Sequence, residues 1–255
     1  MRHHIVWLGL CAMLAASGTA NAVEVELGAS TASLSGGYAT QNTQTLRLGW
    51  RGESDRLLQL SFEHKQAFGE TASLVIAAIA QDLSADDRVG FAAAFSNAKT
   101  IIAQSRVDAF YSRKLLPARN LVATLAGYAT HVADGHQDLG LVGSAAWYLP
   151  DGLVAEAGLR WARSNPGANR AWRGLVGTTW GAVGSDTVAL HLEGGHEAYQ
   201  SLGANAAVAD FRSDEVSLGW RHWLSRDAGL GLDAAQYHNP TYGKRTLGVT
   251  GFFSF

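Results

Sequence analysis

The sequence predicts an all-β protein, a single antiparallel up-and-down transmembrane β-barrel of about 14 strands, with 12 as the alternative count. Three observations predict this fold. Segments of alternating apolar and polar residues recur along the chain, turn residues separate them at regular intervals, and the last segment stops on an aromatic residue, Phe255. An even strand number places both ends of a bacterial barrel on the same side of the membrane.

The first 22 residues predict a cleaved signal peptide. Arg2 precedes an apolar run over residues 5–16, and small residues follow up to Ala22. The run is too short for a membrane-spanning helix, which needs about 20 residues. We therefore expect residues 1–22 to be removed and residues 23–255 to form one outer-membrane β-barrel domain. The only cysteine, Cys11, lies in the removed segment, so the remaining chain has no thiol for a disulfide or a metal site.

The composition is unusual for a soluble enzyme. The chain holds 29 glycines, 4 prolines and only 16% charged residues, whereas soluble domains have about 25% charged residues. No apolar run of about 18 residues occurs after Ala22, which excludes a helical membrane protein. The formal net charge of −2 offers no electrostatic basis for binding nucleic acid.

Alternation is clearest in five segments, which are about as long as a tilted strand that crosses the hydrocarbon core. Residues 71–105 are rich in alanine and alternate weakly, which is why a count of 12 stays open. The apolar positions of the five clear segments are Leu46, Leu48 and Trp50; Leu58, Leu60 and Phe62; Leu153, Ala155, Ala157, Leu159 and Trp161; Val188, Leu190 and Leu192; and Val216, Leu218 and Trp220.

Two sets of connections join the expected strands. Short acidic or proline-bearing turns at 52–55, 84–87, 116–119, 149–152, 183–186 and 225–227 are assigned to the periplasmic side. The other set, which includes 164–170 and 199–210, is assigned to the outside, where barrel loops are usually longer. The loop 199–210 is apolar. One interpretation is that it folds inward as a constriction; the other, slightly favoured, is that it contacts a partner or simply extends the strands.

Aromatic residues recur at both ends of the expected strands. An inner interfacial girdle is predicted from Trp50, Trp147, Trp180, Trp223 and Phe255, which all end a strand that runs toward the periplasm. Four more aromatic residues lie near the expected outer ends: Trp161, Trp172, Tyr199 and Tyr237. We expect them to form an outer interfacial girdle; the alternative is that they stack on sugar rings.

The last strand, residues 242–255, places Leu247, Val249, Phe253 and Phe255 on one face. A terminal aromatic residue preceded by alternate apolar residues is the pattern that the barrel-assembly machinery reads. The expected partners are therefore this machinery and the lipid of the outer membrane.

Strand parity predicts a lumen that carries both signs of charge. These charges either line a pore and select its permeant or pair with one another in a closed interior, and the two interpretations carry equal weight. A barrel of 14 strands lies between filled and open ones. The expected lumen residues are Arg47, Arg51, Glu63, Arg106, Asp108, Glu156, Arg160, His191, Glu193, Glu215, Arg221 and Asp233, with Glu24, Glu26, Lys65 and Glu197 beside them.

No catalytic residue, metal ligand or cofactor is expected. His191 and His196 resemble a metal-binding pair, but on a strand positions five apart point to opposite faces. Glu193 and Glu197 share a face with His191 and remain a candidate site for a cation or for sugar hydroxyls. The chain has no G-x-S-x-G motif for nucleophilic catalysis.

Three stretches resemble the YaiO family of outer-membrane β-barrels. They are Leu34-Ser35-Gly36-Gly37-Tyr38, the turn at 148–152 and the ending at 242–249. The resemblance implies an outer-membrane barrel of Gram-negative bacteria, and because relatives are associated with surface-polysaccharide secretion, it implies transport of or contact with a glycan. A structural barrel that anchors partner proteins and a lipid- or glycan-modifying barrel enzyme are the alternatives.

Overall fold

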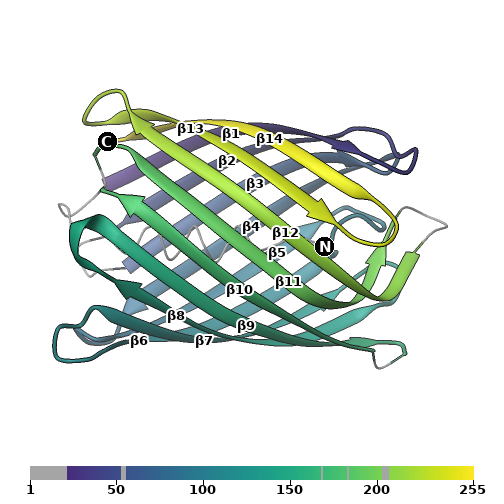
Figure 1. Ribbon diagram of the computed structural model, residues 1–255, viewed down its shortest axis with the longest axis horizontal. Helices are drawn as coiled ribbons and strands as arrows, with labels where there is room; N and C mark the ends of the chain where they lie inside the picture. Colours follow the sequence, from purple (N-terminus) through teal and green to yellow (C-terminus); the bar gives the residue numbers. More distant parts are fainter. Residues whose placement is uncertain (1–21, 53–55, 168, 183, 203–206) are drawn as a thin grey trace.

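A computed structural model describes residues 22–52, 56–167, 169–182, 184–202 and 207–255, so the expected signal peptide lies outside the described residues except for Ala22. These ranges contain fourteen strands (Figure 1). Their bounds are β1 Ala22–Leu34, β2 Gln41–Arg51, β3 Arg56–Ala67, β4 Glu70–Asp82, β5 Asp87–Ser96, β6 Ser105–Leu115, β7 Leu121–His131, β8 Gln137–Tyr148, β9 Leu153–Asn165, β10 Asn169–Gly181, β11 Thr187–Ser201, β12 Ala207–Trp223, β13 Ala228–His238 and β14 Gly243–Ser254; a short 3-10 helix, η2, covers Pro150–Gly152.

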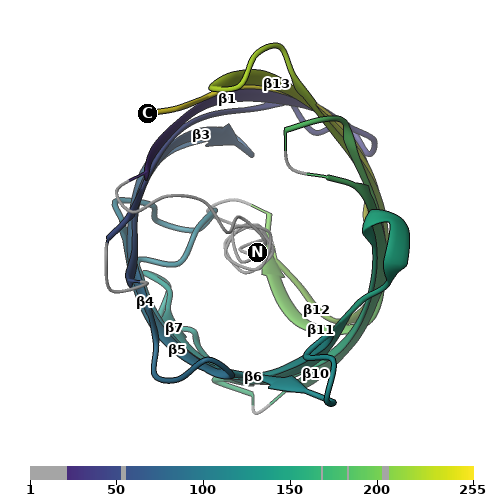
Figure 2. The same cartoon turned by 90° about the vertical axis from the view of Figure 1, so that its left-hand side faces the viewer.

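The strands form one closed antiparallel barrel. Each strand pairs with its neighbours in sequence, and β1 also pairs with β14, so that Leu27 lies opposite Gly251. The end view shows the closed ring (Figure 2). The predicted fold and the count of 14 are confirmed, because the pairing leaves no sheet edge among the described strands. No helix in the described ranges has the length and apolar character needed to cross a membrane.

The alternation of each strand separates an outer apolar face from the interior. Leu159 and Val249 are 57% exposed because they point away from the barrel, where lipid is their natural solvent. In β4 both faces are apolar: Leu74 and Ile76 are buried inside, while Val75 points outward. This double apolar face is why the alternation of residues 71–105 is weak, although β4 and β5 are regular strands.

The short turns lie where the sequence predicts them. The connections 83–86, 116–120, 149–152 and 224–227 lie at one end of the barrel, together with the C-terminus, at the left in Figure 1. Residues 53–55 and 183, in two further turns of this set, lie outside the described residues. At the opposite end β3 and β4 are joined by only Phe68 and Gly69, both with positive φ, as a tight hairpin turn requires.

The inner girdle holds with one correction. Trp50, Trp147 and Trp180 are exposed outward, but Trp223 packs edge-on against Phe252 at 4.8 Å, and Phe252 is completely buried. The prediction for Trp223 was wrong because β12 places Trp223 on the same inward face as Arg221. Trp220 lies on the opposite, outward face of β12, and it is the exposed tryptophan at this end of the strand.

Candidate functional site: the barrel interior

A loop folds inward between β5 and β6. Ala98 and Ile102 of this loop are almost completely buried, and they pack with the inward side chains of Leu74 and Ile76. The Glu70 carboxylate holds the loop by accepting hydrogen bonds from the backbone N–H groups of Lys99 and Thr100 and from the Thr100 hydroxyl at 2.7 Å. The apolar inner face of β4 is therefore covered by this loop.

The far end of the β11–β12 hairpin also folds inward. The last register pair between β10 and β11 is Trp172 with His196, and β11 continues beyond it without β10. Ala198 then packs against Ala162 and Ala171, which face the interior. Figure 2 shows the end of the hairpin inside the ring of strands.

Backbone geometry explains where β11 leaves the wall. Gly195 has φ of 153°, a conformation that favours glycine, and a Cβ at this position would lie 2.2 Å from the carbonyl oxygen of Trp172. Both interpretations of the loop 199–210 hold in part for the residues described: β11 extends to Ser201 and β12 begins at Ala207, as predicted, but the paired ends fold inward; 203–206 lie outside the described residues. The inward fold buries Leu202, which packs with Tyr237 and Tyr242.

Phe68 joins the two inward segments. It packs against the cluster of the β5–β6 loop and against the cluster of the hairpin end. Its ring also makes edge contacts with Tyr38 at 5.4 Å and Tyr242 at 5.8 Å. The two inward segments thus meet around one aromatic side chain at the end of the barrel that is opposite the C-terminus.

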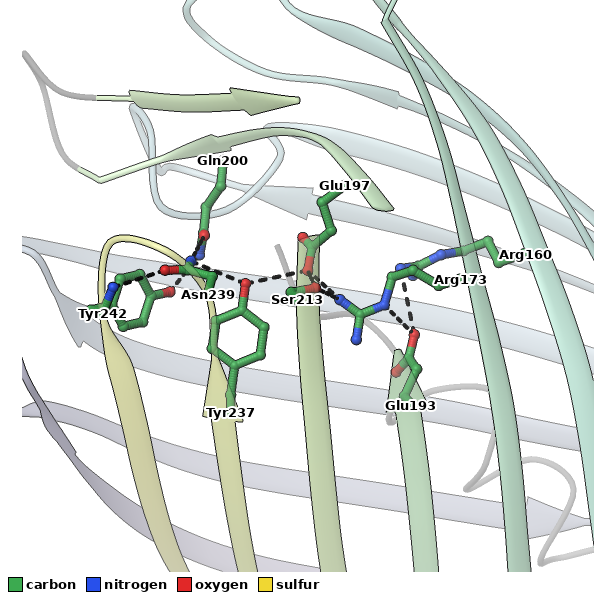
Figure 3. Close-up of polar contacts among 9 residues, drawn as sticks. All are labelled: Arg160, Arg173, Glu193, Glu197, Gln200, Ser213, Tyr237, Asn239 and Tyr242. Carbon is green, nitrogen blue, oxygen red and sulfur yellow. Dashed lines mark hydrogen bonds and ion pairs between the residues drawn. The ribbon is translucent and has the colours of Figure 1, made fainter. Parts of the chain in front are cut away.

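Arg173 of β10 is the centre of a polar network below the hairpin end (Figure 3). Its side chain is 3% exposed and donates from Nε to Glu193 at 2.8 Å and from Nη1 to Glu197 and Ser213. Arg160 adds a second cation 3.5 Å from Glu193. A buried guanidinium requires such compensation, because an unpaired charge in a low-dielectric interior is very costly.

Uncharged groups extend this network to β13 and to the turn between β13 and β14. The Tyr237 hydroxyl donates to Glu197 at 3.2 Å, and Asn239 donates to the Tyr237 oxygen and to Gln200. Gln200 in turn donates to the Tyr242 hydroxyl at 2.5 Å (Figure 3). The hairpin end is therefore hydrogen-bonded to the wall as well as packed against it.

A second charged cluster lies nearer the C-terminal end. Arg47 of β2 contacts Glu26 at 2.6 Å, and Arg221 of β12 lies 3.4 Å from Glu24 and 3.6 Å from Glu26. Since β12 and β1 are not neighbours in the barrel, Arg221 reaches them across the interior. Its guanidinium also lies 4.1 Å from the centre of the Phe252 ring.

Other expected lumen residues form smaller pairs. Arg106 and Asp108 bind each other within β6 at 2.6 Å, and Arg106 lies 4.3 Å from the Tyr128 ring centre. Glu156 and His191 approach to 3.6 Å. The structure thus brings Glu156 and His191 of β9 and β11 together, but Arg106 and Asp108 stay separate from both larger clusters.

The remaining charges occupy inward positions of their strands. Asp233 lies beside Gly219 of β12 on the inner face. Arg51 of β2, Glu63 of β3 and Glu215 of β12 also lie at inward positions, and their side chains are half-buried.

The outer aromatic residues do not form one set. Trp161 and Trp172 are exposed on the outer surface, whereas Tyr237 is 3% exposed inside and does not belong to an outer girdle. Tyr199 stacks on His136 with ring centres 3.9 Å apart. The assignment of Tyr237 was wrong because the inward face of β13 carries it into the polar network.

The two histidines of the metal-like motif lie on opposite faces of β11. His191 contacts the inward Glu156, whereas His196 contacts Asp210 at 3.4 Å. Within the described ranges no group of three His, Cys, Asp or Glu side chains is arranged to hold a metal ion.

Sequence reasoning missed Arg173 and Glu70. The parity of β10 contains the signal for Arg173, because Ala171, Arg173 and Leu175 alternate with the outward Trp172. Glu70 has no comparable signal, since its role depends on a loop that lies about 30 residues further along the chain.

A closed antiparallel barrel with an apolar outer face and a charged interior defines an outer-membrane β-barrel protein. The chain belongs to the YaiO family: the model of the YaiO membrane beta barrel domain matches residues 22–200. No curated protein matches the sequence.

Solved structures share the fold at low identity. The CymD monoaromatic hydrocarbon channel aligns with a TM-score of 0.59 and 8% identity, over 92% of this chain and 88% of its own. A bacterial polysaccharide outer membrane secretin aligns with 0.56 and 9%, over 93% and 100%. An anion-selective porin from Comamonas acidovorans aligns with 0.51 and 10%, over 91% and 98%.

Proposed function

We propose that the protein is a gated outer-membrane channel for a hydrophilic solute, and that a polysaccharide is the candidate cargo. The observation that carries this proposal is the pair of charged clusters on the inner wall, around Arg221 near one end and Arg173 near the other. Charged side chains in a lumen provide a polar path and select among permeants. The family association and a structural neighbour described as a polysaccharide secretin support the choice of cargo.

The inward segments favour a gated channel over a permanently open one. The hairpin end and the β5–β6 loop meet at Phe68, at the end opposite the C-terminus. Charges of the interior pair with one another, as Arg47 does with Glu26 and Arg173 with Glu193. Opening then requires the hairpin end to move and the Arg173 network to exchange partners.

The test is single-channel conductance of the purified protein in a planar bilayer, with the hairpin locked or free. Ala171 and Ala198 are small and in one packed cluster, so a double variant Ala171→Cys with Ala198→Cys provides a lock that a reductant removes. The oxidised double variant should stay closed, and reduction should restore openings. Each single-cysteine variant serves as the matched control and should not respond to reductant.

The outcomes of this test separate the channel from the two alternative functions. Absence of conductance in correctly folded protein, locked and unlocked, would refute the channel proposal and favour a barrel that anchors partners. An enzyme at the rim would instead show turnover of a lipid or glycan that does not depend on the lock.

A further inference from the structure

The inward fold of the hairpin leaves a hollow in the outer surface of the barrel wall. Pairing of β11 with β10 ends at His196, and pairing of β12 with β13 ends at Asp214. At this place a cavity of about 540 Å³ is lined by residues that include Trp172, Gly194, Gly195, Arg212, Asp214 and His238. We call this cavity the wall notch.

The wall notch opens outward, toward the membrane. Trp172 at its edge is 55% exposed, and Arg212 and His238 are exposed as well. Gly194 leaves space that a side chain would fill, since a Cβ there would meet no atom closer than 3.7 Å. The buried Ser213 and Asn239 also line the notch, so its floor is the back of the polar network that faces the interior.

Basic side chains gather at the notch. Arg212 and His238 line it, and Arg170 lies two residues from Trp172 on the outward face of β10, opposite Arg163 of β9. Within the described ranges, Arg163, Arg170 and Arg212 form no ion pair, and Asp214 is the acidic side chain in the lining. Unpaired arginines on the outer face of a barrel are destabilising in the hydrocarbon and tolerated only near the headgroups.

The outer surface places the notch at headgroup level. Toward the middle of the barrel the same face is apolar, with Val176, Leu192 and Leu218 exposed. Trp161 and Trp172 mark the change from apolar to charged residues, where amphipathic rings prefer to lie. With the C-terminus in the periplasm, this level belongs to the outer leaflet, which in such membranes is formed by phosphorylated glycolipid.

We propose that the wall notch binds the phosphorylated headgroup of an outer-leaflet glycolipid. The guanidinium groups of Arg212 and Arg170 bind phosphate through paired N–H donors, a geometry that suits arginine. Trp172 contacts the boundary between the sugar and the acyl chains. The ligand is a lipid because the notch opens onto the membrane rather than onto either aqueous side.

The experiment measures lipid binding by native mass spectrometry of the purified full-length protein in detergent. Diphosphoryl lipid A is compared with the same lipid stripped of phosphate and with inorganic phosphate. The double variant Arg170→Gln with Arg212→Gln should bind diphosphoryl lipid A about tenfold more weakly, as expected for the loss of charged hydrogen bonds. Arg226→Gln, an exposed arginine of the β12–β13 turn at the opposite barrel end, is the matched control and should bind like the wild type.

Equal binding of phosphorylated and dephosphorylated lipid would overturn the proposal, because the arginines would then contribute nothing. Equal competition by inorganic phosphate would show an anion site and not a lipid site. Heat-modifiable migration on a gel checks that each variant is folded. This readout needs no conductance, so the result stands apart from the channel proposal.

Discussion

Arg173 Nε lies 2.8 Å from Glu193 Oε1, and the same guanidinium binds Glu197. One guanidinium of β10 therefore binds two carboxylates of β11, one on each side of Gly195, where that strand turns into the barrel. The arrangement couples the direction of the hairpin to the charge of the interior.

Replacing Arg173 should destabilise the barrel. Arg173→Met leaves two poorly exposed carboxylates with less positive charge nearby, a change that costs about 3–5 kcal/mol for buried pairs. Urea unfolding in detergent, followed by tryptophan fluorescence, measures the loss. Arg170→Met, an exposed arginine on the same strand, should stay within about 0.5 kcal/mol of the wild type; equal losses in the two variants would contradict the role of Arg173.

Reversing the charge of Arg221 should change ion selectivity. Arg221→Glu places a third carboxylate beside Glu24 and Glu26, so the open channel should become more cation-selective. Reversal potentials in a salt gradient across a planar bilayer measure the shift. Arg226→Glu in the neighbouring turn is the control, and the same shift there would show a surface effect instead.

Two adjacent glycines should respond differently to alanine. Gly195→Ala forces a Cβ against the Trp172 carbonyl and into a backbone region that disfavours side chains, so the loss should exceed about 1 kcal/mol. Gly194→Ala meets no atom closer than 3.7 Å and should be nearly neutral. The melting temperature in detergent compares the pair, and similar values would argue that β11 does not need glycine to bend.

The contact between Tyr199 and Asp134 should hold the hairpin across neutral pH. Partial burial raises the pKa of Asp134, but hydrogen bonds from the His136 backbone and side chain and from the Tyr199 hydroxyl outweigh it and lower the pKa below 3.8. A carboxylate with a lowered pKa contributes its stabilisation above 3.8 and loses it as the pH falls through the folded-state pKa. The frequency of channel openings should thus rise as the pH falls below about 4, where Asp134 takes up a proton.

Asp134→Asn should weaken this dependence. Its openings should be more frequent than those of the wild type at neutral pH, and the rise in acid should be smaller. An unchanged acid response in Asp134→Asn would assign the response to another group.

The sequence by itself determined the strands, most turns and the outer face. Period-2 alternation is a local property, so segments such as 153–161 and the last strand could be placed without knowing their neighbours, and turn residues marked their ends. Even the inward parity of Arg221 follows from the alternation of β12 alone.

Only the tertiary structure decided what the interior contains. The partners of Arg173, the contact of Glu70 with a loop about 30 residues away and the inward turn of β11 at Gly195 each depend on which strands become neighbours. An apolar loop such as 199–210 can bury its hydrophobic side chains in more than one place, and no local sequence pattern distinguishes these places. The closed ring of strands makes the choice, because it offers buried surface at Tyr237, Tyr242 and Phe68 against which the hairpin end packs.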